Sequence, residues 1–321
     1  VGELIQSQEL YTSRGYLSAG APVLHFGLGK ATTVDHLEVY WPGGGKTILD
    51  EIPANQTLVV KQQSENIELL PKPHGEVLSE ATAADRHGLE FVHQEDQFVD
   101  FEVEPLMPNL LSTQGPGMAI GDVNDDGLED LFIGGAQGQA GALFLQQAGG
   151  VFKQISNPIL ENIESEVVDA TFFDCDQDGD LDLLIANGGG AFPEGHPQLL
   201  DRLYINDGRG HFSYAPDGLP AIARNSACVV PLDFDQDGAM DLFIGMRSVP
   251  THYGLSPQSV LLRNTGQGQF EDVTEQYLPD LGKLGMVTDA TVLGQGDQME
   301  LVVVGEWMPI RFLSIGTGMW R

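Results

Sequence analysis

Three acidic loops of one form are the residues in this sequence best suited to chemistry. They begin at Asp122, Asp174 and Asp233, and each follows the pattern Asp-x-Asp/Asn-x-Asp-Gly-x-x-Asp. Carboxylates packed this closely repel one another unless a cation neutralises them. The all-oxygen donor set predicts a hard divalent ion. Calcium fits best, because it takes roughly six to eight oxygen ligands in a flexible shell.

Each position of the nine-residue loop has an expected role. Side chains at positions 1, 3, 5 and 9 supply oxygens, and position 7 offers a backbone carbonyl. We expect glycine at position 6 because a Cβ would obstruct the sharp turn of the backbone there. The predicted calcium ligands in the three loops are Asp122, Asn124, Asp126, Leu128, Asp130, Asp174, Asp176, Asp178, Asp180, Asp182, Asp233, Asp235, Asp237, Ala239 and Asp241.

The loops are not EF-hands, although they share the spacing of acidic residues. An EF-hand requires a bidentate glutamate at position 12 and a helix on each side. Position 12 here is Ile133, Ile185 or Ile244, within short apolar segments rich in β-forming residues. The alternative is an acidic surface turn without metal, since Asp and Gly are common turn residues. Three matching copies favour metal binding over that alternative.

The loops belong to a repeat, and the repeat predicts the architecture. The starts at residues 122, 174 and 233 give spacings of 52 and 59 residues. Each loop is followed by a strand, an Asn/Gly-type turn and an aromatic residue, namely Phe152, Phe212 and Phe270. Several short strands at this period predict propeller blades. A fourth unit aligns Glu300 with Asp182, but its loop is two residues shorter, so we expect only three calcium sites.

These residues resemble the FG-GAP/VCBS repeats of integrin-α-type β-propellers. The stretch from Gly121 to Gly135, the strand after it and the later hairpin turn match in that order. The resemblance covers about residues 83–321 and implies calcium loops between two strands at the rim of each blade. In this family the ion braces the blade. The predicted fold is all-β: a partial propeller of about three and a half blades, preceded by a small β module.

The first residues resemble a different family, the ASPIC/UnbV module. The resemblance rests on His25-Phe-Gly-Leu-Gly, on the run from Val34 to Trp41 with its following Pro-Gly-Gly-Gly, and on Pro53-Ala-Asn-Gln-Thr-Leu. In cartilage acidic protein-like and bacterial surface proteins this module usually follows a propeller, whereas here it precedes one. We therefore expect a piece of a longer protein. Its predicted parts are an ASPIC/UnbV-like module (1–65), a linker (66–82) and propeller blades (83–321) that are incomplete at the C-terminus.

The amino-acid composition limits the kinds of partner that this chain can bind. The chain has 321 residues, 47 acidic and 15 basic, with a formal net charge of −32. Such a surface repels nucleic acid and anionic membranes, and no apolar run is long enough to span a membrane. The two cysteines, Cys175 and Cys228, exclude a disulfide scaffold, and we expect two free thiols rather than a bridge.

The sequence is compatible with two functions. The first is a calcium-binding, non-catalytic propeller that binds an unknown protein or glycan, as an adhesion or ligand-binding scaffold. We expect it outside the cell or on a bacterial surface, because such loops suit millimolar extracellular calcium. The alternative is a polysaccharide lyase or hydrolase on the same scaffold. That enzyme would require His, Lys, Arg or Tyr side chains to converge away from the Asp loops.

Overall fold

A computed structural model describes residues 5–10, 23–41, 45–61, 87–156, 164–294, 299–316 and 319–320. The chain divides into two compact units, Val1–Ala81 and Thr82–Arg321, and each is described by itself. The predicted linker, residues 66–82, lies outside the described residues. The predicted domain limits, 1–65 and 83–321, stay predictions.

The described residues of the N-terminal unit include a β-hairpin. Strands β1 (Thr33–Tyr40) and β2 (Lys46–Pro53) pair antiparallel, with Tyr40 opposite Lys46 at the turn. The Trp41 indole donates a hydrogen bond to Thr47 Oγ1 at 2.8 Å across the same end. The run that begins at Val34 in the sequence is therefore part of the first strand of this hairpin, which ends at Tyr40.

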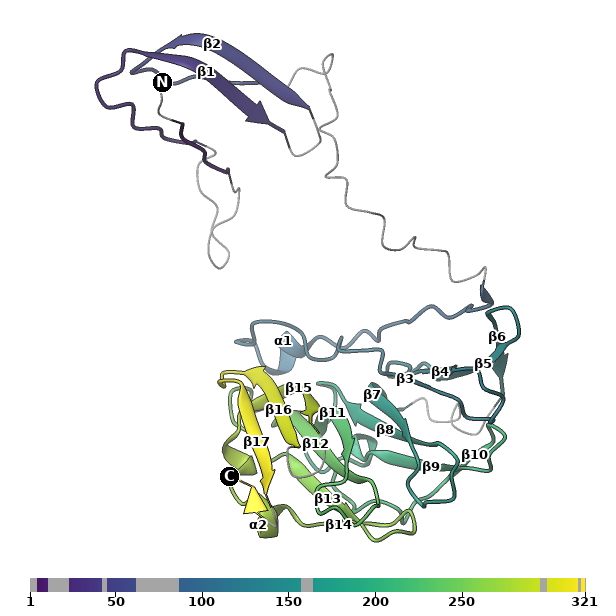
Figure 1. Cartoon of the computed structure of the whole chain (residues 1–321). Helices are drawn as coiled ribbons and strands as arrows, with labels where there is room; N and C mark the ends of the chain where they lie inside the picture. The colour runs from purple at the N-terminus through teal and green to yellow at the C-terminus, as the bar shows by residue number, and fades with distance from the viewer. Residues whose placement is uncertain are drawn as a thin grey trace. The chain divides into compact units, whose positions relative to one another are not determined.

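The second unit consists of four antiparallel sheets of four strands each, which follow one another in chain order (Figure 1). The first sheet contains β3 (Met118–Gly121), β4 (Asp130–Ile133), β5 (Ala142–Gln147) and β6 (Val151–Ile155). The second contains β7 (Glu166–Phe173), β8 (Asp182–Gly188), β9 (Arg202–Asn206) and β10 (Phe212–Tyr214). The third contains β11 (Asn225–Leu232), β12 (Asp241–Ser248), β13 (Val260–Asn264) and β14 (Phe270–Asp272). The fourth contains β15 (Met286–Leu293), β16 (Glu300–Glu306), β17 (Arg311–Gly316) and β18 (Met319–Trp320).

Successive sheets pack face to face, as blades of a propeller do. The first strands β3, β7, β11 and β15 lie beside one another in that order. Three apolar clusters fill the interfaces between sheets, and each draws residues from two neighbouring blades. Phe132 with Leu183, Leu184 with Leu242, and Phe243 with Leu301 are examples from the three clusters. The continuous apolar runs of β8 and β12 are explained by this packing, since every residue of both strands is buried.

Only short helical turns interrupt the strands that the structure describes. They are α1 (Asp100–Val103), η3 (Pro197–Leu199), α2 (Thr274–Tyr277) and η4 (Leu281–Lys283). The segment 87–117, which contains α1, enters at the first blade, where His87 Nδ1 is 3.0 Å from the carbonyl oxygen of Gly150. It also reaches the third blade, where Arg247 Nε donates to Gln114 Oε1 at 3.1 Å.

The second unit is therefore an all-β partial propeller, as the sequence predicts. The fourth sheet is a complete set of four strands rather than half a blade, although its last strand has only two residues. Among the described residues, no helix has the length and apolar character needed to cross a membrane.

Candidate metal centres

The three Asp loops occupy the same place in three successive blades. Loop 1 (122–130) joins β3 to β4, loop 2 (174–182) joins β7 to β8, and loop 3 (233–241) joins β11 to β12. In each sheet, the residue before the loop pairs with the aspartate at position 9: Gly121 with Asp130, Phe173 with Asp182, and Leu232 with Asp241. The repeat seen in the sequence is thus a repeat of strand register.

The loop backbone passes twice through the left-handed region. The residues at position 4, Asp125, Gln177 and Gln236, have φ values of 56°, 65° and 61°. The glycines at position 6 have φ values of 82°, 95° and 92°. These φ values agree with the expectation that a Cβ would obstruct the turn of the backbone, and no atom beyond the adjacent residues lies within 4 Å of that point at Gly127, Gly179 or Gly238. The backbone angle itself selects glycine.

The carboxylate at position 1 organises each loop before any ion is considered. In loop 2, Asp174 Oδ1 accepts the N–H of Gln177 at 2.7 Å, and Oδ2 accepts that of Gly179 at 3.1 Å. Asp122 accepts the N–H groups of Asp126 and Gly127, and Asp233 does the same at the corresponding positions. These backbone donors bend the loop around its own carboxylates, so the side chains at positions 1, 3 and 5 are gathered locally.

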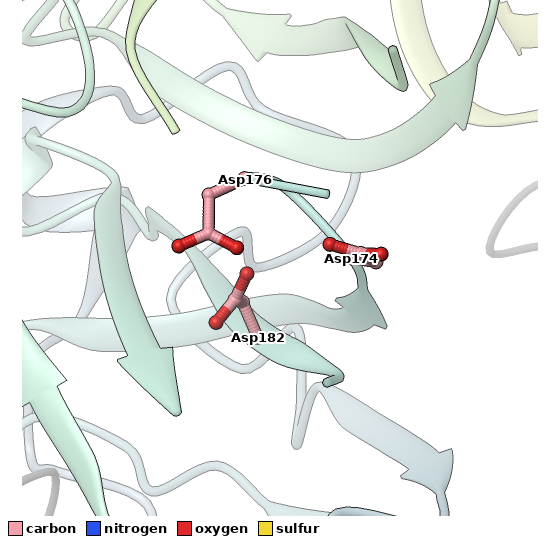
Figure 2. A group of neighbouring side chains, drawn as sticks. All are labelled: Asp174, Asp176 and Asp182. Atoms are coloured by element: carbon pink, nitrogen blue, oxygen red, sulfur yellow. The ribbon is translucent and has the colours of Figure 1, made fainter. Parts of the chain in front are cut away.

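Two loops bring acidic oxygens close enough to share an ion. Figure 2 shows Asp174, Asp176 and Asp182 around loop 2, where one oxygen from each lies within 4.8 Å of the others. Asp233, Asp235 and Asp237 form a second such group in loop 3. In loop 1, position 3 is Asn124, and the described residues of that loop show no such group of three acidic side chains. The chemistry of these groups fits a hard cation with oxygen ligands.

The remaining predicted ligands have local roles in the loop. The position-5 carboxylates of Asp126, Asp178 and Asp237 accept the N–H of position 7, at 2.8 to 2.9 Å. Position 7 is occupied by Leu128, Asp180 and Ala239. Their carbonyl oxygens stay predicted ligands.

The aspartate at position 9 is part of the fold as well as of the loop. Asp130, Asp182 and Asp241 are buried. One oxygen of Asp182 accepts the N–H of Cys175 at 3.0 Å, and the other accepts the N–H of Asn206 in β9 at 2.8 Å. Asp241 makes the same pair of bonds with Phe234 and Asn264. The aspartate at position 9 therefore links the loop to the third strand of its own blade by hydrogen bonds.

Two asparagines connect each loop to its neighbour. Asn206 Nδ2 donates to the carbonyl oxygens of Val123 in loop 1 and Leu181 in loop 2, at 2.8 and 3.0 Å. Asn264 Nδ2 likewise donates to Cys175 in loop 2 and Met240 in loop 3, at 2.7 and 3.0 Å. The sequence marks both residues only as turn positions at a fixed distance from a Gly-x-Gly pair. Their bridging role between blades was not predicted.

Burial and mutual repulsion raise the pKa values of several carboxylates in loops 2 and 3. Burial and the charges of Asp235 and Asp237, opposed by the N–H groups of Asn264 and Phe234, raise the pKa of Asp241 to about 7. Burial and the charges of Asp182 and Asp178 raise the pKa of Asp176. Burial and the charge of Asp237 raise the pKa of Asp235. A divalent cation would remove the repulsive part of each shift.

The fourth blade is different at the equivalent place. Leu293 pairs with Glu300, which confirms the alignment of Glu300 with the position-9 aspartates. The connection between them is shorter than the Asp loops, and residues 295–298 lie outside the described residues. The predicted loss of this metal site therefore stays a prediction.

The fold and the loops define a class of protein, an all-β partial propeller with acidic loops at equivalent strand connections, and family comparisons agree with it. Residues 1–67 match the family described as ASPIC and UnbV. Residues 122–185 and 174–244 match the FG-GAP-like repeat. The two repeat matches begin at Asp122 and Asp174, the first residues of loops 1 and 2. The chain thus carries an ASPIC/UnbV domain followed by FG-GAP-like repeats.

Comparison with whole proteins adds little beyond this. No curated protein matches the chain. One similar solved structure is a Trypanosoma rangeli sialidase in complex with sialic acid, with 11% sequence identity and a TM-score of 0.33. The match covers 62% of this chain and 29% of the sialidase, so the chain spans less than a third of that protein.

Proposed function

We propose that this chain is a calcium-binding, non-catalytic propeller that acts outside the cell as an adhesion or ligand-binding scaffold. The observation that carries the proposal is the set of acidic clusters, each with three carboxylate oxygens within 4.8 Å, built into the strand connections of loops 2 and 3. Calcium would offset the repulsion in these clusters. It would also stabilise loops that Asn206 and Asn264 join across blades. Millimolar extracellular calcium suits such sites.

The test is thermal unfolding with and without calcium. An ion that binds only the folded state raises stability by mass action, so EGTA should lower the melting temperature by many degrees. Calorimetric titration of the stripped protein with calcium should give three sites. Asp126→Ala, Asp178→Ala and Asp237→Ala should each remove one of them. Asp217→Ala, at an exposed position away from the loops, is the matched control. An unchanged melting temperature in EGTA would contradict the proposal.

A polysaccharide-active enzyme is the second candidate, because polar side chains converge away from the Asp loops. Glu306 accepts hydrogen bonds from the Tyr253 hydroxyl and from Arg247 Nη2. Burial and the bond to Glu306 raise the pKa of Tyr253 to about 12. Burial alone would raise the pKa of Glu306, but the hydrogen bonds from Tyr253 and Arg247 lower it below its ordinary value. A tyrosine with this pKa stays protonated near neutral pH and is a poor nucleophile, which favours binding over catalysis.

The two candidates differ in what they predict for a glycan panel. An enzyme would release new reducing ends, and a substitution outside the Asp loops would abolish that release. A binding scaffold would leave every glycan intact. Release of reducing ends that survives in Asp178→Ala but is lost in Tyr253→Phe would favour the enzyme.

A further inference from the structure

The position-9 aspartates of loops 1 and 2 are joined by a continuous path of hydrogen bonds. In loop 1, the Val123 N–H donates to Asp130 Oδ2 at 3.1 Å. The carbonyl oxygen of Val123 accepts from Asn206 Nδ2 at 2.8 Å. The backbone N–H of Asn206 donates to Asp182 Oδ1 in loop 2, also at 2.8 Å. Only Val123 and Asn206 thus separate a predicted calcium ligand of loop 1 from a predicted ligand of loop 2.

The same path recurs between loops 2 and 3. The Cys175 N–H donates to Asp182 Oδ2 at 3.0 Å, and the Cys175 carbonyl oxygen accepts from Asn264 Nδ2 at 2.7 Å. The backbone N–H of Asn264 donates to Asp241 Oδ1 at 2.8 Å. Asp182 belongs to both paths, one through each of its carboxylate oxygens. Loop 2 is therefore the middle member of a chain of three loops.

These paths leave little room for one loop to move without its neighbour. Every residue in them is buried. Each bridging amide also donates to its own loop, Asn206 to Leu181 and Asn264 to Met240, both at 3.0 Å. A buried N–H or C=O that moved away from its partner would lose a hydrogen bond with no water to replace it. A change in one loop is therefore transmitted to the next.

An ion would act at the ends of these paths. In the ion-free loops the carboxylates repel one another, and fixing them around an ion costs conformational entropy. An ion that fixes Asp130 and the backbone of loop 1 also fixes Asn206, and through it Asp182. The next ion then meets a loop that has already lost part of its conformational freedom, so it pays less of the ordering cost.

We propose that neighbouring loops bind calcium with positive cooperativity, transmitted by Asn206 between loops 1 and 2 and by Asn264 between loops 2 and 3. This inference rests on the proposed calcium binding and adds how that binding is regulated. Coupling between two sites is reciprocal, so each loop of a pair raises the affinity of the other by the same factor. The blades would fill with calcium over a narrower range of concentration than three independent sites.

The test is calorimetric titration of the full chain with calcium after loops have been removed in combination. Asp237→Ala leaves loops 1 and 2, Asp126→Ala leaves loops 2 and 3, and Asp178→Ala leaves loops 1 and 3. The three double variants leave one loop each and give its affinity alone. We expect each neighbouring pair to bind its second ion about fivefold or more tightly than the single loops predict. Loops 1 and 3 should bind as independent sites, which makes that pair the matched control.

The bridging asparagines provide a second measurement. In the Asp237→Ala background, Asn206→Ala should remove the coupling between loops 1 and 2. Asn264→Ala in the same background leaves that bridge intact and should preserve the coupling. Neither substitution changes a charge, so repulsion between the bound ions cancels in the comparison. If Asn206→Ala does not fold, the three aspartate pairs alone decide.

The outcomes separate this inference from the calcium proposal. Independent binding in all three pairs would overturn the cooperativity while leaving three calcium sites in place. Equal coupling in the pair of loops 1 and 3, or coupling that survives in folded Asn206→Ala, would overturn the role of the asparagine bridges. No uptake of calcium by the unaltered protein would contradict both proposals.

Discussion

Asn264 in the third blade donates a hydrogen bond to the carbonyl oxygen of Cys175 in the second blade at 2.7 Å, across 89 residues of sequence. The same amide donates to Met240 in its own blade, and its oxygen accepts the N–H of Gly266 at 2.9 Å. A single buried side chain thus joins two Asp loops and one hairpin turn. Because position 2 of the loop carries the bridging carbonyl, the loop conformation and the packing between blades are coupled.

Asn264→Ala should destabilise the protein even when calcium is saturating. The substitution removes three hydrogen bonds and leaves buried backbone groups without partners, at a cost of about 1–3 kcal/mol for each unsatisfied group. The free energy of unfolding from urea titration measures the effect. Asn109→Ala is the control, since Asn109 is exposed and its amide bonds only its neighbour Leu110. Equal stability of the two variants would show that the bridge contributes nothing.

Aspartates at positions 5 and 9 of one loop should respond differently to chelation. Asp178 is exposed and its hydrogen bonds stay within its loop, whereas Asp182 is buried and accepts the N–H groups of Cys175 and Asn206. Asp178→Ala should therefore lower the melting temperature in calcium but have little further effect in EGTA. Asp182→Ala should lower it in both, by about 2–4 °C for each kcal/mol lost. If EGTA abolished the effect of both substitutions, position 9 would act only through the ion.

The sequence was most informative where the chemistry is local. Loop 2 could be predicted because all its acidic residues lie within nine positions, and the register of Phe173 with Asp182 follows from the short connection. The bridging hydrogen bonds of Asn264 could not be predicted, because its partner Cys175 is 89 residues away in the sequence. The turn motif alone would explain an asparagine at this position equally well. The convergence of Arg247, Tyr253 and Glu306 was missed for the same reason. These residues come from two blades, and Gln114 and Glu104 reach them from the segment 87–117.

The calcium-free protein should lose stability as the pH rises, and Glu166 should account for part of that loss. Burial, with the charges of Glu95, Asp96 and Asp100, raises the pKa of Glu166 to about 9. The folded state then holds a proton that the unfolded state releases near the ordinary value of 4.5. Stability therefore falls between these two pH values, by up to about 1.4 kcal/mol per pH unit.

Glu166→Gln isolates this contribution, because glutamine keeps the size of the side chain but cannot ionise. Unfolding in urea at pH 5, 7 and 9, with EGTA present, should show a smaller decline for the variant than for the unaltered protein. Asp201 and Asp169, whose pKa values burial raises to about 7 and about 6, remain in both proteins and cancel in the difference. Parallel pH profiles would contradict a protonated Glu166 in the folded state.

Chelation should expose one of the two thiols and not the other. Cys175 and Cys228 are free, as the sequence predicts, and both are buried in the structure. Burial raises the pKa of both, that of Cys228 to about 12, and only the thiolate attacks a disulfide reagent. In calcium, neither thiol should react with DTNB until urea unfolds the chain.

Cys175 lies at position 2 of loop 2, where its N–H donates to Asp182 and its carbonyl oxygen accepts from Asn264. Cys228 lies within β11. In EGTA, Cys175 should therefore become reactive first, and Cys228→Ser should keep that fast phase while Cys175→Ser removes it. A fast phase that persists in Cys175→Ser would show that chelation exposes Cys228 in β11 rather than Cys175 in loop 2.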